Sequence, residues 1–285
     1  MRLGFHIPLS EDGEAIRGLG EHLLASGHFD WIEVKYPYDV LGFDGAAYDR
    51  AVRRLVEEFQ PGVSLHVPTH YDLGMWSTAV RDRILDQVEA SIDYSAELGA
   101  SVLPIHPGTI LHMDIPNGRH GGAAERVRKA AQRKKARAAD LTVFALQRLA
   151  ERAERYGITL ALENVLLPQE IVYSADDLAE LLDRVNRDNV RALFDSGHAN
   201  RVGLHAPSFI RSLGHRLAHV HVNDNDGTCD LHQQLGEGTV DFAGIFTALV
   251  EQGFSGTVVV ETAYRSKDDL AESSRRIRGY LEAAS

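Results

Sequence analysis

Short apolar segments of strand length alternate along the chain with longer amphipathic segments of helical period. Helical periodicity is clearest over residues 81–99 and 141–157, and the second segment ends on Gly157, a residue typical of helix C-caps. Eight strand–helix units in 285 residues predict an α/β fold, a single (β/α)8 TIM barrel. A doubly wound open sheet would need a glycine-rich phosphate turn after the first strand, and FHIPLSEDGE is not such a turn. The predicted strands are the segments 2–7, 31–36, 63–68, 101–107, 159–164, 190–195, 217–223 and 257–262.

Within each predicted strand, successive side chains alternate between the barrel interior and the surrounding helices. Bulky apolar residues such as Leu3, Phe5, Ile32 and Val34 mark the positions that face the helices. The last inward position of every strand is polar or ionisable: His6, Lys35, His66, His106, Glu163, Asp195, His221 and Glu261. Active sites of this fold lie where the strands end. We therefore predict one barrel domain over residues 1–285, with its active site at this rim.

Carboxylates and histidines that share one barrel mouth are costly to bury unless a cation or protons compensate their charge. His, Asp and Glu side chains suit zinc, manganese, cobalt or iron better than calcium. The simplest site for one ion uses four consecutive strands, with the ligands Glu163, Asp195, His221 and Glu261. A hydrogen-bonded polar network without a metal is the alternative.

Three further residues extend the predicted site from the loops above the strands. In FDSGH, His198 lies three residues past Asp195, in the turn that leaves the sixth strand. In DLH, Asp230 and His232 would face the same way if the loop is extended, although such a pair alone is typical of solvated loops. His219 shares the inward parity of His221 but lies deeper, so we interpret it as a core residue or a support for a ligand.

Composition and charge narrow the range of partners. The net charge of −11 disfavours a surface of positive potential for nucleic acid. The basic run 119–137 is interpreted as the solvated face of a long helix, with a local basic patch as the alternative. The chain opens on a predicted strand without a secretory signal, has no apolar run of membrane length and carries one cysteine, Cys229. These features predict a cytoplasmic protein.

The motifs LHVP, HPG, LENV, FDSGH, HVHVNDNDGTCDLHQQLGEG and VVVET, in this order, resemble the xylose-isomerase-like TIM-barrel superfamily. This superfamily contains sugar isomerases and epimerases and also the endonuclease IV family. The resemblance covers essentially the whole chain. The order of the motifs is specific for the superfamily and much less specific for the reaction.

In the isomerase and epimerase branch, the resemblance implies one divalent metal (manganese, cobalt, magnesium or zinc) on Glu163, Asp195, His221 and Glu261. Glu163 and Glu261 would also transfer the proton, one removing it beside the substrate carbonyl and the other returning it, through a metal-stabilised enediolate. His198 would hydrogen-bond a substrate oxygen. The other predicted substrate-binding residues are Lys35, His6, His66 and His106.

In the endonuclease IV branch, the resemblance implies three zinc ions, and a zinc-bound hydroxide that attacks phosphorus. The first ion would lie on His66, His106 and Glu163, with Glu163 bridging to the second ion. The second would lie on Asp195, His221 and Glu261, and the third on His198, Asp230 and His232. Every one of these positions is filled in this chain.

Two segments depart from the endonuclease pattern. VPTHYDLG after His66 differs from the HxxYLINLG-like segment of that family, and NDNDGTC is acidic and lacks its Ser-Lys run. We therefore predict a metal-dependent isomerase or epimerase of a sugar, sugar phosphate or related polyol. The alternative is an endonuclease IV-like trinuclear zinc phosphoesterase that cleaves abasic-site DNA or small phosphoesters.

The predicted partner is a small carbohydrate, with nucleic acid only under the alternative and no membrane, while homo-oligomer formation stays open. A ligand-binding barrel without catalysis would not need two inward glutamates beside a metal. Specificity lies in the loops of this fold. The glycine-rich loop 108–122 is predicted to be a lid or substrate loop, with a mobile surface loop as the alternative.

Overall fold

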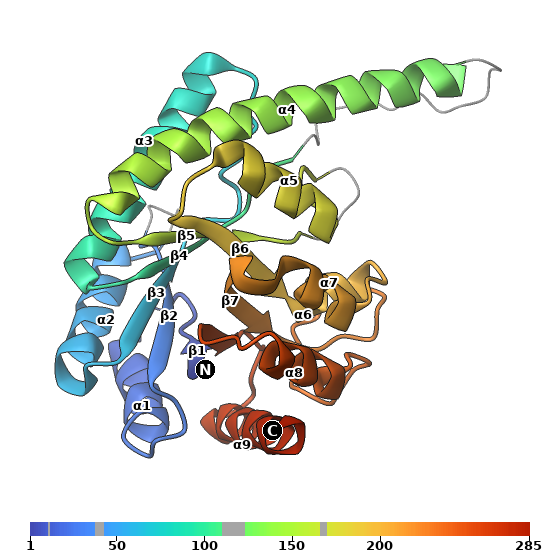
Figure 1. Cartoon of the computed structure of the whole chain (residues 1–285). Coiled ribbons are helices and arrows are strands. Elements are labelled where there is room, and N and C mark those ends of the chain that lie inside the picture. Colours follow the sequence, from blue (N-terminus) through green and yellow to red (C-terminus); the bar gives the residue numbers. More distant parts are fainter. Residues whose placement is uncertain (11, 38–42, 110–122, 166–169) are drawn as a thin grey trace.

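The computed structural model describes residues 1–10, 12–37, 43–109, 123–165 and 170–285, with the backbone alone over residues 123–131. Its eight parallel strands form a closed barrel in chain order (Figure 1). The last strand, β8, pairs with β1. The predicted (β/α)8 fold is confirmed. The strands are β1 (Arg2–His6), β2 (Trp31–Lys35), β3 (Gly62–His66), β4 (Val102–Ile105), β5 (Thr159–Glu163), β6 (Val190–Asp195), β7 (Leu217–Val222) and β8 (Thr257–Val260).

Helices surround the barrel, and the first and last of them contact each other to close the outer ring (Figure 1). The predicted helix 81–99 corresponds to α3, and the predicted helix 141–157 is the last part of the longer α4, whose beginning extends beyond the barrel (Figure 1). The helices are α1 (Gly13–Leu23), α2 (Gly45–Phe59), α3 (Thr78–Leu98), α4 (Ala123–Glu154), α5 (Ala175–Val185), α6 (Ser196–Arg201), α7 (Ala206–Leu213), η1 (Gly214–Arg216), α8 (Phe242–Glu251) and α9 (Lys267–Ala284).

Several predictions about surface segments have mixed outcomes. Arg133, Lys134 and Arg137 of the basic run are exposed on α4, as expected for a solvated face, and the earlier side chains of the run lie outside the described residues. Most of the predicted lid, residues 110–122, also lies outside the described residues. No helix in the described ranges is long and apolar enough to cross a membrane. The assignment of residues 1–285 to one domain stays a prediction.

The strand side chains alternate as predicted, with Phe5, Ile32 and Leu65 among the fully buried residues of the core. Most strands end one or two residues earlier than predicted. At β3 and β4 the physical reason is the following Pro68 and Pro107, which have no N–H to donate to the sheet. The rim residues keep their register: Lys35 pairs with His66, and Asp195 pairs with His221.

The amino-terminal end of the barrel is filled by Trp31, which is 2% exposed. A β-carbon at Gly62 would lie 1.9 Å from Trp31 Cε3, so the indole requires glycine at this position of β3. Trp31 Nε1 donates a hydrogen bond to Ser64 Oγ at 3.0 Å. The polar interior of the barrel therefore begins directly above this indole ring.

Candidate metal centre

The predicted ligands converge at the rim around the carboxylate of Glu163, which is 1% exposed. Its Oε2 atom lies 3.3 Å from His66 Nε2 and 3.2 Å from His106 Nε2. Its Oε1 atom lies 3.2 Å from His198 Nδ1 and 3.7 Å from His221 Nδ1. One side chain at the end of β5 thus lies between two groups of nitrogen ligands.

The Nδ1 atom of His221 lies at the centre of the four-residue site. It is 3.1 Å from Glu261 Oε2, 3.9 Å from Asp195 Oδ2 and 3.7 Å from Glu163 Oε1. His221 is fully buried, and within the described part of the chain this nitrogen has no hydrogen-bond partner. A buried imidazole nitrogen among three carboxylates fits a divalent cation, because one nitrogen and several oxygen ligands suit such an ion.

Two further groups of potential ligands flank this centre. His66, His106 and Glu163 offer ligand atoms within 4.8 Å of one another, and His198, Asp230 and His232 do the same. In the second group, Asp230 Oδ2 lies 3.2 Å from His232 Nε2 and 3.9 Å from His198 Nε2. The structure therefore brings together every ligand group that the two branches of the superfamily imply.

Backbone carbonyl groups orient three of the histidine rings. A carbonyl oxygen only accepts hydrogen bonds, so the facing ring nitrogen must carry the hydrogen, and the other nitrogen keeps its lone pair for a metal. In each of these rings Nδ1–H donates to the carbonyl and Nε2 is the nitrogen left to offer to an ion, although Nδ1 of His198 also lies near Glu163. The pairs are His66 with Val67 (2.6 Å), His198 with Asn164 (2.7 Å) and His232 with Glu261 (2.7 Å).

The FDSGH motif folds differently from its predicted form. His198 lies in the short helix α6, not in an irregular turn, because Asp195 caps this helix: its Oδ1 atom accepts from His198 N at 2.7 Å. The other oxygen, Oδ2, accepts from Asn223 Nδ2 at 2.9 Å. A β-carbon at Gly197 would lie 1.8 Å from Asn223 Oδ1, which explains the glycine of the motif.

The loop that carries DLH does not meet the condition of an extended backbone, because His232 has a left-handed backbone with φ of 45°. Asp230 and His232 still approach each other because the following residue, Gln233, pairs with Asp224 in an antiparallel bridge. The side chain of Asp224 is buried and accepts from the backbone N–H groups of Gly236, Gly238 and Val240. This carboxylate of NDNDG thus organises its own loop.

Buried charges shift the pKa values of Glu163 and His198 in opposite directions. Burial would raise the pKa of Glu163, but the charge of His106 and hydrogen bonds from His106 and His198 hold it well below its ordinary range. Burial would lower the pKa of His198, but the charge of Asp195 and the contact with Glu163 raise it to about 10. The site therefore stabilises positive charge strongly, and a metal ion would replace protons here.

The mouth contains a second set of shifted groups. Burial opposes charge on His232, but its hydrogen bond with Asp230 and the charge of Glu261 raise its pKa to about 9. Burial and then the charge of Lys35 lower the pKa of His6 to about 3, so His6 is neutral. Lys35 Nζ lies 3.4 Å from Glu261 Oε1. Lys35 and His6 thus lie on the Glu261 side of the mouth.

Sequence reasoning missed three polar residues of the site. Glu33 lies one inward position below Lys35 on β2, and its parity was the signal that could have found it. Asn164, in the LENV motif, accepts from Asp195 N at 2.7 Å and donates to Asp195 O at 3.1 Å. Glu170, in the loop after β5, has a pKa that burial raises to about 7, partly offset by His106. No periodicity marks a loop residue of this kind.

Comparisons with known proteins identify the family of this chain. The sequence model of the xylose isomerase-like TIM barrel family matches residues 22–282, and the chain belongs to this family. Fructoselysine 3-epimerase from Shigella flexneri is 24% identical over 242 residues, which cover 81% of this chain and 80% of that protein. Inosose isomerase from Bacillus subtilis (strain 168) is 33% identical over 126 residues, 42% of this chain and 45% of that protein.

Among solved structures, the IolI protein with a bound zinc atom has a TM-score of 0.75 at 21% identity. The match covers 100% of this chain and 99% of that chain. At this identity the similarity shows the shared barrel fold.

Proposed function

We propose that this chain is a divalent-metal-dependent isomerase or epimerase of a sugar or related polyol. The observation that carries the proposal is the convergence of three carboxylates on the buried Nδ1 atom of His221 at the barrel rim. The names of the relatives support the reaction class, since they include a fructoselysine 3-epimerase and an inosose isomerase. The zinc atom in the IolI structure supports a bound metal in this fold.

Glu163, Asp195, His221 and Glu261 would hold the ion, which can be manganese, cobalt, magnesium or zinc. When bound, the ion would polarise the substrate carbonyl and acidify the adjacent C–H bond. Glu163 ends β5 and Glu261 follows β8, two strands that β6 and β7 separate in the barrel. With one carboxylate on each side of the substrate carbon, one removes the proton and the other returns it.

The remaining polar residues of the mouth would bind substrate oxygens. Lys35 and His6 lie beside Glu261, where a hydroxyl, carboxylate or phosphate of the substrate could accept from the Lys35 ammonium. His66 and His106 lie beside Glu163, and His198 lies between Glu163 and Asp230. We assign these five side chains to orientation of the sugar and not to the proton transfer itself.

Exchange of carbon-bound hydrogen with solvent tests the proposal. The metal-loaded protein is incubated in deuterium oxide with ketoses and inososes, and NMR follows loss of the C–H signal beside the carbonyl. Glu261→Gln should lower the rate by at least about 100-fold, because general acid–base catalysis contributes at least that factor. Glu237→Gln, at an exposed glutamate paired with Arg265, is the matched control and should leave the rate unchanged. Absence of exchange with every such substrate would contradict the proposal.

A trinuclear zinc phosphoesterase is the second candidate, and the assembly of all three ligand groups favours it. Elemental analysis of protein purified without added metal distinguishes the two: the isomerase site predicts about one ion per chain and the phosphoesterase about three. Cleavage of an abasic-site duplex, lost in His232→Ala, would establish the second candidate. One tightly bound ion without such cleavage would exclude it.

A further inference from the structure

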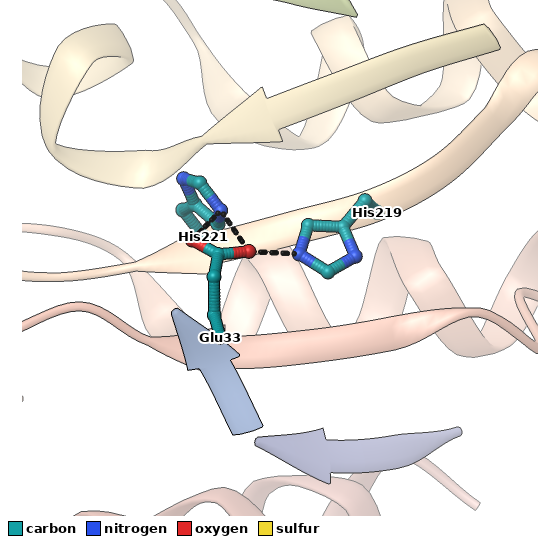
Figure 2. A group of neighbouring side chains, drawn as sticks. All are labelled: Glu33, His219 and His221. Atoms are coloured by element: carbon teal, nitrogen blue, oxygen red, sulfur yellow. Dashed lines mark hydrogen bonds and ion pairs between the residues drawn. The ribbon is translucent and has the colours of Figure 1, made fainter. Parts of the chain in front are cut away.

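Below the rim, the carboxylate of Glu33 lies between two histidine rings of β7 (Figure 2). Its Oε2 atom lies 3.0 Å from His219 Nε2, and its Oε1 atom lies 3.1 Å from His221 Nε2. All three side chains are fully buried. The two rings meet edge to face, with centroids 5.2 Å apart, so the carboxylate faces a nitrogen of each ring.

A carboxylate in this position is costly to bury, and packing alone does not require one. Three donors compensate it: the two histidine rings and Ser64, whose Oγ donates to Glu33 Oε2 at 2.9 Å. Ser64 in turn accepts from Trp31 Nε1 at 3.0 Å. A continuous chain of hydrogen bonds therefore runs from the indole at the barrel floor, through Glu33, to His221 at the metal centre.

His221 differs from the other histidines of the site in the nitrogen that it offers. His66, His198 and His232 are held at Nδ1 by carbonyl groups, which leaves Nε2 as the nitrogen that each ring can offer to an ion. His221 turns Nδ1 to the carboxylates, and Glu33 is the acceptor that faces its Nε2 in the described structure. An ionised carboxylate only accepts hydrogen bonds, so it fixes the hydrogen on Nε2.

We propose that Glu33 is a positioning residue that holds His221 in the Nε2–H form, aims Nδ1 at the ion and strengthens its bond to the metal. His219 and Ser64 keep Glu33 in place. This inference rests on the metal site of the proposed function, but not on the identity of the substrate. A carboxylate behind a metal-bound imidazole makes the nitrogen a stronger ligand, and losing such a partner costs about 10- to 100-fold in metal affinity.

Binding of Co²⁺ to the full chain, in competition with a coloured chelator, tests the role of Glu33 without any sugar. Glu33→Gln keeps an acceptor for His221 but removes the negative charge, and should weaken Co²⁺ binding about tenfold. Glu33→Leu removes the acceptor as well as the charge, and should weaken Co²⁺ binding about 100-fold. The visible absorption of bound Co²⁺ should also change, since it reports on the ligands. The control is Glu237→Gln, the same exchange at an exposed glutamate paired with Arg265, and it should keep wild-type affinity.

Nitrogen-15 NMR of the histidines in the zinc-loaded wild-type protein gives a measurement that needs no variant. It should show His221 protonated at Nε2 with the metal on Nδ1, and the opposite form would overturn the proposal. Wild-type affinity and an unchanged Co²⁺ spectrum in both Glu33 variants would also overturn it and leave the proposed function intact. Weakened binding in the variants, together with no hydrogen exchange on any ketose, would support Glu33 and contradict the isomerase.

Discussion

Asn164 shows how one amide can fix a metal ligand. Its side chain donates to the backbone carbonyl of Asp195 and accepts from the backbone N–H of the same residue. It thereby joins the end of β5 to the end of β6, so that Glu163 and Asp195 keep their spacing. Both contacts are buried, where an unpaired backbone group costs about 1–3 kcal/mol.

Asn164→Ala should lower the free energy of unfolding by about 2 kcal/mol and weaken metal binding, because it removes two buried hydrogen bonds to the backbone of Asp195. The matched control is Asn189→Ala at the opposite end of β6. Asn189 also makes two hydrogen bonds to backbone, with Ala150 O and Ile158 O. Urea unfolding should show a similar loss in both variants, and competition with a chelator should show weaker metal binding in Asn164→Ala alone. Equal metal affinities would contradict this role of Asn164.

At the scale of the element, the short helix α6 carries His198 over the mouth and leaves no space at Gly197. An added β-carbon would lie 1.8 Å from Asn223 Oδ1, and Asn223 is the residue that donates to Asp195 Oδ2. Gly197→Ala should therefore destabilise the fold by about 1–3 kcal/mol, typical of overpacking, and weaken metal binding by displacing Asn223.

Gly18 in α1 offers the opposite case, because apart from its chain neighbours and the backbone of the helix itself no atom lies within 4 Å of an added β-carbon there. Gly18→Ala should raise the free energy of unfolding by about 0.5–1 kcal/mol, since alanine favours the helix interior, and leave metal binding unchanged. Thermal unfolding of Gly197→Ala and Gly18→Ala, with and without metal, measures the change in stability and in metal binding for each variant. Stabilisation by Gly197→Ala would show that α6 can move away from Asn223.

At the scale of the whole molecule, alternation of side chains was enough to predict the closed barrel and the inward direction of residues such as Glu163 and His221. That prediction succeeds because strand parity is local and the core face is apolar throughout. It fails where the backbone leaves the sheet. The left-handed conformation of His232 and the helix around His198 depend on contacts with Asp224 and Asp195, which sequence spacing does not reveal. Glu33 has the same inward parity as Lys35 and was missed because only the last inward position of each strand was considered.

The pH dependence of stability should reverse when the metal is removed. His198 and His232 have pKa values of about 10 and about 9, above their ordinary value of 6.5, because nearby carboxylates favour their charged forms. A raised pKa adds stability that is fully present below pH 6.5 and is lost as pH rises through the folded value. The free energy of unfolding of EDTA-treated protein should therefore fall between about pH 6.5 and about pH 10.

Bound metal changes the sign of this dependence, because the ion replaces the protons and its affinity rises as they are lost. Urea unfolding over the same pH range gives the free energy of unfolding at each pH. With EDTA this free energy should fall as pH rises, and with saturating zinc it should stay constant or rise. His232→Gln should make the EDTA curve less steep, since it removes one of the two raised groups. Parallel curves with and without zinc would mean that the ion does not displace the protons of His198 and His232, and would contradict this prediction.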